Sequence, residues 1–395
     1  MTKLSSIADY VTDKISSNDI ALREYVTTDC ILQNKKGREI ATNLPPQSCC
    51  LTRYQHGDVL IANIRPYLKK VWFADIDGGA SSDVLVFRAK EGHSPSFLYA
   101  VLLQDSFFDY VMQGAKGSKM PRGDKEQILR YEMPTLSCSE ESIGTFFLNL
   151  DQKIRLNEQI NQNLEAMAKQ LYDYWFVQFD FPNEEGKPYK SSGGEMVWNE
   201  KLKRKIPNEW DNCKLKDFIN LFDSKRIPLS SKDREERKGN YPYYGATGIM
   251  DYVNEYIFDG DYILLAEDGS TSDSKGFPIV QYIWGKNWVN NHAHIILPKN
   301  EQYLMFTYQM LRSIPAKQIE TGSIQKKISQ ENLCEYNMVL PNSILIEKYE
   351  SIISPLWEKR KLCIEEINAL IKQRDELLPL LMNGQASVNS DLSLD

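Results

Sequence analysis

Two stretches of the chain carry basic and hydroxyl side chains in the same order. They are GSKMPRGDKEQILRYEM at 117–133 and GSIQKKISQENLCEYNM at 322–338. Aligned without a gap, both begin with Gly-Ser, and a glutamate, a tyrosine and a methionine coincide further along. Lysine and arginine pair with phosphate groups, and arginine and glutamine can also form paired hydrogen bonds with base edges. These residue types indicate binding of an anionic polymer, and their repetition indicates two equivalent sites.

Residues suited to bond-breaking chemistry are sparse. His292 and His294 would share one strand face, which suits a metal pair, but no third ligand stands at a diagnostic spacing, and a polar strand face is the alternative. The run AEDGSTSDSK at 266–275 could serve a metal-dependent nuclease or form an ordinary acidic turn. The sequence has no GxxxxGK[ST] loop for nucleotide phosphates, and NLPPQ at 43–47 is the nearest string to the [DN]PP[YF] motif of amino-methyltransferases. We therefore expect no catalytic residue, no cofactor and no metal ion.

Two long helices must position the repeated stretches. Apolar residues recur at spacings of three and four in 140–176 and again in 345–381. The two segments align at an offset of 207. Each would be about 55 Å long at ~1.5 Å per residue. Narrow apolar stripes need a partner, so we expect the helices to pair with each other as a coiled coil. Asn157 interrupts the first stripe and either fixes the register or lies at a surface edge.

A region of mixed character precedes each helix. Short β-rich runs such as DVLVF at 83–87, YILLA at 262–266 and AHIIL at 293–297 alternate with turn residues. The predicted fold class is α+β, with two tandem mixed α/β domains separated by two long antiparallel coiled-coil helices in a pseudo-two-fold arrangement. The predicted boundaries are 1–138 for the first domain, 139–179 for the first helix, 180–205 for an exposed linker rich in Gly, Pro, Ser and charge, 206–343 for the second domain, 344–383 for the second helix and 384–395 for a flexible tail.

Composition sets the class of protein. The chain has 395 residues, too many for one ordinary core, and its 42% hydrophobic and 11% aromatic content is typical of globular proteins. No apolar run is long enough to cross a membrane, and the N-terminal residues lack the apolar core of a signal peptide. The seven cysteines form no CxxC motif, which fits reduced thiols. We expect a cytoplasmic protein without membrane contact.

The distribution of charge qualifies the net charge of −7. Nine acids and three bases lie in 139–186, and nine acids and six bases lie in 345–395, so the rest of the chain has a net charge of +2. Basic clusters in that remainder are either solvated surface charge or phosphate contacts, and their recurrence in the repeat favours phosphate. A pseudo-symmetric molecule with two such regions suits a long, two-part target, and double-stranded DNA is one.

The candidate DNA contacts combine the basic clusters with the polar residues of the two Gly-Ser stretches. Arg122 and Gln325 are candidates for base contacts, although either could equally meet a phosphate. The serine after each glycine suits close approach to a backbone or base edge. The full set is Arg65, Lys69, Lys70, Lys116, Ser118, Lys119, Arg122, Lys125, Lys225, Arg226, Ser323, Gln325, Lys326 and Lys327.

Three stretches resemble a known family. LDQKIRLNEQINQNLEAMAKQLYDYWFVQFDFPNEEGKPYKSSGGEM at 150–196 resembles the central conserved region of specificity subunits of type I restriction-modification systems. IPNEW at 206–210, followed by YPYYGATGIMDYVNEYIFDGDYILLAEDGS at 241–270, resembles one type of target-recognition domain. RYQHGDVLIANIRPYLKKVWFADIDGGASSDVLVF at 53–87 resembles another. The first domain lacks the IPxxW lead-in of the second.

The resemblance implies a function without catalysis. Such a subunit has two target-recognition domains, here 1–138 and 206–343, and two spacer helices that carry the central and C-terminal conserved regions. It is not an enzyme. It would bind an asymmetric, bipartite DNA target and hold two methyltransferase subunits, and nuclease-translocase (restriction) subunits would join through that complex.

Aromatic residues gather where the first helix ends, in YDYWFVQFDF at 172–181. They either pack between the helix and the second domain or form a docking surface for the methyltransferase, because aromatic side chains anchor interfaces. The candidate interface residues are Tyr172, Tyr174, Trp175, Phe176 and Trp357.

Two rival functions remain at this point. The first is a metal-dependent DNA endonuclease whose acids escape recognition, which metal-dependent cleavage by the isolated chain would support. The second is a coiled-coil scaffold that bridges proteins without binding DNA, which failure to bind any duplex with partners present would favour.

Overall fold

The computed structural model describes residues 2–133, 139–322 and 326–388. It is an α+β structure that divides into two compact units. Unit 1 consists of residues 1–159 and 363–395, and unit 2 consists of residues 160–362. Each unit combines one sheet-rich region with part of both long helices, so this division differs from the boundaries predicted from the sequence, which set each helix apart.

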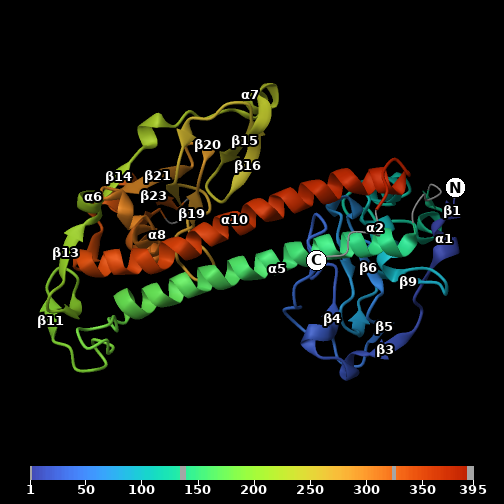
Figure 1. Ribbon diagram of the computed structural model, residues 1–395, viewed down its shortest axis with the longest axis horizontal. Helices are drawn as coiled ribbons and strands as arrows, with labels where there is room; N and C mark the ends of the chain where they lie inside the picture. Colours follow the sequence, from blue (N-terminus) through green and yellow to red (C-terminus); the bar gives the residue numbers. More distant parts are fainter. Residues whose placement is uncertain (1, 134–138, 323–325, 389–395) are drawn as a thin grey trace. The chain divides into compact units, whose positions relative to one another are not determined.

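Unit 1 is built on two four-stranded sheets with the orders β2-β9-β6-β7 and β3-β5-β8-β4, and on the short pair β1-β10 (Figure 1). Its elements before the long helix are β1 (Thr2–Lys3), α1 (Leu4–Ile7), β2 (Ala8–Tyr10), β3 (Lys14–Ser16), β4 (Tyr25–Val26), β5 (Cys50–Tyr54), β6 (Val59–Ala62), β7 (Val71–Phe73), β8 (Gly78–Ala80), β9 (Val84–Ala89), α2 (Pro95–Leu103), α3 (Asp105–Gln113), α4 (Lys125–Ile128) and β10 (Glu132–Met133).

Unit 2 repeats this plan with the sheets β14-β21-β18-β19 and β16-β15-β20-β17 and the pair β13-β24. It adds the hairpins β11-β12 and β22-β23. Its elements are β11 (Met196–Asn199), β12 (Arg204–Pro207), β13 (Asp211–Lys214), α6 (Leu215–Phe218), β14 (Ile219–Leu221), α7 (Ser231–Glu236), β15 (Lys238–Tyr244), β16 (Ile249–Val253), β17 (Phe258–Asp259), β18 (Tyr262–Ala266), β19 (Val280–Ile283), β20 (Lys286–Val289), β21 (Ala293–Pro298), α8 (Leu304–Ser313), β22 (Glu320–Thr321), β23 (Lys327–Ile328), α9 (Gln330–Glu335) and β24 (Asn337–Leu340).

The repeat seen in the sequence is a repeat of the fold. Met133 of β10 pairs with Thr2, and its aligned partner Met338 of β24 pairs with Cys213. Both methionines are buried. The carbonyl of Tyr131 accepts from Leu4 at 2.8 Å, and that of Tyr336 accepts from Leu215 at 2.9 Å. The aligned residues therefore close the two units with the same strand pairs and the same backbone hydrogen bonds.

Alternating side chains place the central sheet of each unit between two apolar layers. In β6, Val59 and Ile61 pack with the helices α2 and α3, whereas Leu60 faces the second sheet. In β18, Ile263 and Leu265 pack with α8, whereas Leu264 faces the second sheet. This alternation follows from the two-residue period of a strand, because successive side chains point to opposite faces.

The two predicted long helices are present. They are α5 (Glu140–Tyr172), extended by a π-helical turn at Asp173–Val177, and α10 (Ser343–Met382). In unit 1, Asn157 donates to Glu366 at 2.8 Å and Asp151 pairs with Arg374 at 3.3 Å. In unit 2, Glu165 pairs with Arg360 at 3.1 Å. In unit 1, residue numbers increase along α10 as those of their partners decrease along α5, so the two helices are antiparallel there. Asn157 is buried and forms a polar contact between them.

Two expectations about these segments need correction. The predicted stripe on the first helix is not buried throughout, because Ile160, Met167 and Tyr174 are exposed and Ala168 and Tyr172 take the buried face. The segment at 180–205 is also not a simple exposed linker: it contains β11 and the start of β12, and Phe181 stacks on Trp210 in the core of unit 2. Among the described residues, no helix is long and apolar enough to cross a membrane.

Candidate nucleic-acid interface

Backbone pairing closes each Gly-Ser stretch at its ends; the stretches are here called GS loop 1 (residues 116–122) and GS loop 2 (residues 321–327, of which 321, 322, 326 and 327 are described). Lys116 and Arg122 exchange backbone hydrogen bonds of 2.9 Å in both directions. Thr321 and Lys327 pair in the ladder of β22 and β23. The four residues correspond at an offset of 205, so the two loops are closed at equivalent positions.

Each loop is held by the end of an equivalent strand, β6 in unit 1 and β18 in unit 2. Ile64, just after β6, bridges Arg122, and the backbone N–H of Gly123 donates to the carbonyl of Asn63 at 3.4 Å. Asp268, just after β18, bridges Lys327. The N–H of Ile328 donates to the carbonyl of Glu267 at 2.8 Å, which matches the Gly123 contact. The fold thus presents two loops on one common backbone frame.

The first glycine of each loop is required by its backbone conformation. Gly117 has a φ of 99° and Gly322 a φ of 86°, in the left-handed region that side chains with a Cβ rarely adopt. Asp124 and Ser329 then cap the short helices α4 and α9 that follow the loops. The shared glycine therefore has a structural cause.

In unit 1 the loop carries exposed cations. Lys119 is exposed and has no ion-pair partner among the described residues, and Ser118 beside it is also exposed. Arg122, whose side chain is 57% exposed, pairs with Asp83 at 3.1 Å. Lys116 pairs with Asp124 at 3.0 Å. These side chains lie on or beside one loop, and their role as DNA contacts stays a prediction.

Arg65 lies beside GS loop 1, and its backbone N–H donates to the carbonyl of Pro121 at 2.8 Å. Its φ of 54° is left-handed, which is uncommon for a residue with a side chain. Lys125 is exposed in the helix α4. Lys69 and Lys70 are engaged elsewhere: Lys69 pairs with Asp105 at 2.9 Å, and Lys70 donates to the carbonyl of Thr28 at 2.6 Å.

In unit 2 the loop cations are paired with acids. Lys326 pairs with Glu320, and Lys327 pairs with Glu267, each at 3.1 Å. Lys225 is exposed over the ring of Phe222. Ser323 and Gln325, also predicted as contacts, lie outside the described residues. The described cations of this loop are thus tied to carboxylates of their own unit.

Arg226 is a structural residue in unit 2. Its Nη1 donates to Glu267 at 2.8 Å and to the carbonyl of Ala293 at 2.8 Å, and the side chain is 12% exposed. It was predicted as a DNA contact from its place in a basic cluster. The structure shows that its guanidinium holds the strand ends together, which leaves little of it for an external phosphate.

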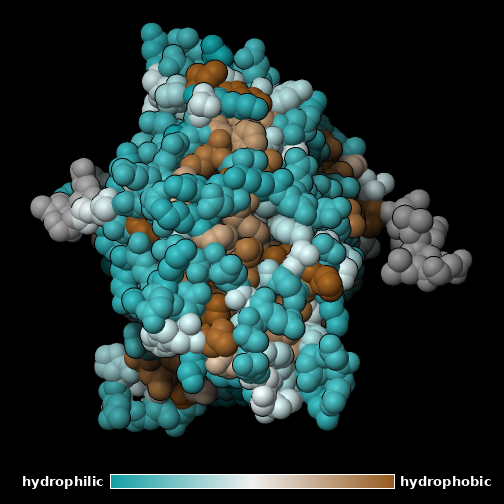
Figure 2. Space-filling model, turned by 90° about the vertical axis from the view of Figure 1, so that its left-hand side faces the viewer, coloured by the Kyte–Doolittle hydropathy of each residue, from teal (hydrophilic) through white to brown (hydrophobic). Residues whose placement is uncertain are grey.

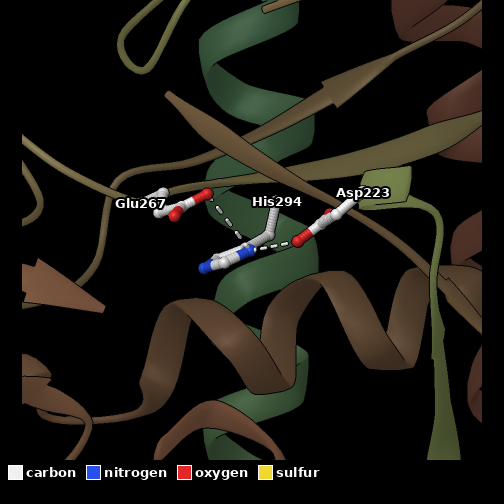
Figure 3. Close-up of side chains that lie close together, drawn as sticks. All are labelled: Asp223, Glu267 and His294. Carbon is white, nitrogen blue, oxygen red and sulfur yellow. Dashed lines mark hydrogen bonds and ion pairs between the residues drawn. The ribbon is translucent and has the colours of Figure 1, made fainter. Parts of the chain in front are cut away.

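A buried cluster of Asp223, Glu267 and His294 lies under GS loop 2 (Figure 3). Burial acts to raise the pKa of Asp223, but hydrogen bonds from His294, Ile295 and Gln330 outweigh it and hold that pKa below its ordinary value. Burial likewise opposes the hydrogen bonds from Arg226 and Lys327 that lower the pKa of Glu267. Both carboxylates are therefore ionised and already accept from cations of the chain.

This cluster differs from the histidine pair considered from the sequence. His292 is exposed and pairs with Asp268 at 2.6 Å, whereas His294 is fully buried and pairs with Asp223 at 2.6 Å. The two histidines have separate partners. The acids around His294 come from segments distant in sequence, and neither Asp223 nor Gln330 belongs to a recognisable motif, so no sequence signal identified the cluster.

Four of the five predicted interface aromatics are core residues. Tyr172, Trp175, Phe176 and Trp357 are at most 5% exposed and pack in the main apolar core of unit 2. The packing alternative accounts for them, because a buried ring cannot present a docking surface. Tyr174 is 37% exposed and is the member of the set that a partner could reach.

Tyr174 lines a groove of about 830 Å³ between α5 and α10 in unit 2. Figure 2 faces the end that carries β11 and β13 and shows apolar side chains at the surface among hydrophilic ones. Met167 and Ile352 are exposed apolar residues of the groove. The groove is lined by Ala166, Met167, Lys169, Gln170, Leu171, Asp173, Tyr174, Gln178, Ile352, Ile353 and Leu356.

Comparisons with known proteins agree with the arrangement. Residues 207–367 match the family model of the type I restriction modification DNA specificity domain. The chain is 23% identical over 398 residues to the type I restriction enzyme MjaIX specificity subunit of Methanocaldococcus jannaschii, covering 95% of this chain and 86% of the relative. Over 142 residues, or 36% of this chain and 35% of the relative, it is 34% identical to a putative type I specificity subunit of Haemophilus influenzae, S.HindORF215P.

The fold has a counterpart among solved structures. The S subunit of a type I restriction-modification system from M. genitalium superposes with a TM-score of 0.60 at 16% identity, covering 96% of this chain and 95% of that one. Specificity subunits are the non-catalytic members of these systems. We conclude that residues 207–367 match the specificity domain of type I restriction-modification systems, and that the chain as a whole is similar in sequence and in fold to specificity subunits of these systems.

Proposed function

We propose that the two units read the two halves of an asymmetric, bipartite double-stranded DNA target, unit 1 through GS loop 1 and unit 2 through GS loop 2. The observation that carries the proposal is the common backbone frame of the loops, on which different side chains stand. Arg122 and Lys327 close the two loops at equivalent positions, and Lys119 of the first corresponds to Ile324 of the second. Different side chains on one frame are what two different half-site sequences require.

The ion pair of Arg122 in GS loop 1 is compatible with this role. Arg122 and Asp83 are 57% and 37% exposed, and exposed ion pairs contribute only about 0–1 kcal/mol. Arg122 can therefore exchange the carboxylate for a phosphate or a guanine edge at small cost. Lys119 needs no such exchange. Arg226 supports the strand ends under GS loop 2, whereas Lys69 and Lys70 are engaged by Asp105 and by the carbonyl of Thr28, away from GS loop 1.

The test is to exchange residues 1–138 for the corresponding region of another specificity subunit and to assemble the complex with its methyltransferase subunits. Methylated sites are then selected from a random DNA library. We expect one half of the target to change and the other half to remain. A change in both halves, or in neither, contradicts the assignment of one half-site to each unit.

We also propose that the chain holds methyltransferase subunits, two in the assembled enzyme, and that restriction subunits join through them. The groove around Tyr174 supports this proposal, because exposed apolar patches mark interaction surfaces and aromatic residues anchor them. None of its lining residues belongs to GS loop 2, so a partner in the groove and DNA at the loop would contact different residues.

Met167→Glu tests the groove. A carboxylate there would have to be desolvated on docking, so the variant should lose co-purification with the methyltransferase subunit. Ile249→Glu is the matched control, since Ile249 is an exposed apolar residue of β16 outside the groove. Equal binding by both variants would show that the partner docks elsewhere.

A further inference from the structure

A buried polar network clamps the residue that follows GS loop 2. The side chain of Ile328 is buried and its N–H donates to the carbonyl of Glu267 at 2.8 Å. Its own carbonyl accepts from Nε2 of His294 at 2.8 Å. The other ring nitrogen of His294, Nδ1, lies 2.6 Å from Asp223 (Figure 3). The loop is thereby fixed on both sides of one residue.

Asp223 connects this clamp to two further elements. Its carboxylate accepts from the backbone N–H of Ile295 in β21 at 2.9 Å and from the side chain of Gln330 in α9 at 2.6 Å. His294 is fully buried and faces an acceptor at each ring nitrogen. The other charged groups that face the cluster are Glu267, Arg226 and Lys327.

Unit 1 builds the same loop frame without this network. The strand registers align His294 with Leu85 and Asp223 with Thr12. A leucine and a threonine thus suffice for the backbone hydrogen bonds of GS loop 1. Burying a histidine and an ionised aspartate is costly unless their polar atoms are hydrogen-bonded, so their presence in unit 2 needs a reason beyond the frame.

We propose that His294 and Asp223 are positioning residues that set the geometry of Lys326 and Lys327 for reading the half-site of unit 2. The proposal rests on the function proposed above. Lys327 precedes the clamped Ile328 directly, and Glu267 holds the Lys327 ammonium at 3.1 Å. A loop fixed at its end presents its side chains in one arrangement, and discrimination between bases depends on such fixed geometry.

The test places the two residue types of unit 1 at the equivalent positions of unit 2. Asp223→Thr with His294→Leu removes both partners together, so neither is left buried without the other. The variant is assembled with the methyltransferase subunits, and methylated sites are selected from a random library. We expect base preference in the half-site of unit 2 to fall by about tenfold at one or more positions, with the half-site of unit 1 unchanged. Glu335→Gln is the control, because Glu335 pairs with Lys214 and Lys216 at the surface of the same unit, and it should change neither half-site.

A merely structural role predicts a different result, namely lower yield or a lower melting temperature with unchanged base preference in both halves, and that result overturns the proposal. Should the double variant fail to fold, Gln330→Ala decides, because it removes one hydrogen bond to Asp223 and leaves the ion pair intact. A weaker loss of preference confined to the same half-site supports the proposal, and an unchanged half-site refutes it. The domain exchange on the unmodified chain tests the proposed function separately, so failure of one is distinguishable from failure of the other.

Discussion

The strand ends that hold the two GS loops carry different side chains on the same backbone. The equivalent positions are Asn63 in unit 1 and Glu267 in unit 2. In unit 1 the neutral amide of Asn63 donates to the carbonyl of Gly123 at 3.3 Å. In unit 2 the equivalent residue is Glu267, an ionised side chain shared by Arg226 and Lys327. The backbone contact is the same in both. The difference teaches that main-chain hydrogen bonds and glycine conformation define the frame, while side chains under it are free to specialise.

A second pair of positions shows the same separation. Ile143 of α5 and Glu350 of α10 correspond at the helix offset of 207, and both are buried. In unit 1, Ser94 caps α2 through the N–H of Phe97. In unit 2, no side chain of the N-cap residue does so for α8, and Glu350 accepts from the N–H of Phe306 at 2.7 Å instead. A capping function has thus moved from a local serine to a distant carboxylate.

The largest expected effect comes from breaking the packing under the loops. Ile328 is fully buried, and its counterpart in unit 1 is Gly123, where an added Cβ would lie 2.7 Å from Val111 and 2.9 Å from Asn63. Ile328→Ala should therefore cost about 2–5 kcal/mol of unit 2 stability. Gly123→Ala should cost about 1–3 kcal/mol in unit 1 through overpacking.

Thermal or denaturant unfolding measures both changes. Lys317→Ala, at an exposed position, serves as the control for unit 2. If Gly123→Ala left unfolding unchanged, unit 1 would have room for a side chain at that position. The packing at Gly123 and at Ile328 would then differ less than the structure indicates.

The next effect depends on pH. Burial raises the pKa of Glu350 to about 7, against hydrogen bonds from Phe306 and Ser354 that act to lower it. The folded state therefore binds a proton that the unfolded chain releases between pH 4.5 and about 7, so this residue makes unit 2 less stable as pH rises through that window. The loss is up to about 3 kcal/mol, at ~1.4 kcal/mol for each unit of pKa.

Glu350→Gln keeps an acceptor for Phe306 and removes the charge. It should be more stable than the natural chain at pH 8 and nearly equal to it at pH 4.5, by melting temperature. Glu347→Gln, at an exposed position of the same helix, should show no such trend. The difference in melting temperature between Glu350→Gln and the natural chain could instead stay constant from pH 4.5 to 8. That result would show that the folded state does not raise the pKa of Glu350.

Substitution of Arg65 should change stability little but should weaken recognition of the unit 1 half-site. The equivalent residue of unit 2 is Gly269, and both are left-handed, with φ of 54° and 74°. Arg65→Gly relieves strain of about 1–2 kcal/mol and adds unfolded-state entropy of similar size, so stability should change by less than about 1 kcal/mol. Recognition of the unit 1 half-site should nevertheless weaken, measured by methylation of short duplexes. Arg65→Lys is the matched variant, because it keeps a positive charge. Equal methylation by Arg65→Gly and Arg65→Lys would show that the Arg65 guanidinium does not contact the DNA.

Much of the frame followed from the sequence, because periodicity and turn residues act locally. The spacing in 140–176 and 345–381 predicted α5 and α10, and runs such as YILLA predicted β18. The aligned Gly-Ser stretches predicted equivalent loops, which the structure confirms for their described residues.

The rest depends on contacts between distant segments. Nothing near Arg226 in the sequence shows that Glu267 and Ala293 will enclose it, and nothing in YDYWFVQFDF distinguishes buried Trp175 from exposed Tyr174. Charge and aromatic content identify candidates, but burial decides whether a side chain serves the core or the surface. That decision is made by the tertiary fold.

The most direct test of the account is an exchange of the loops alone. Residues 322–327 are replaced by GSKMPR, the sequence of residues 117–122, which keeps the glycine and places arginine where Lys327 pairs with Glu267. The complex with methyltransferase subunits then selects methylated sites from a random library. We predict a normally assembled complex whose unit 2 half-site changes while its unit 1 half-site is retained. An assembled, active complex with the original unit 2 half-site would contradict the claim that the GS loops read the DNA.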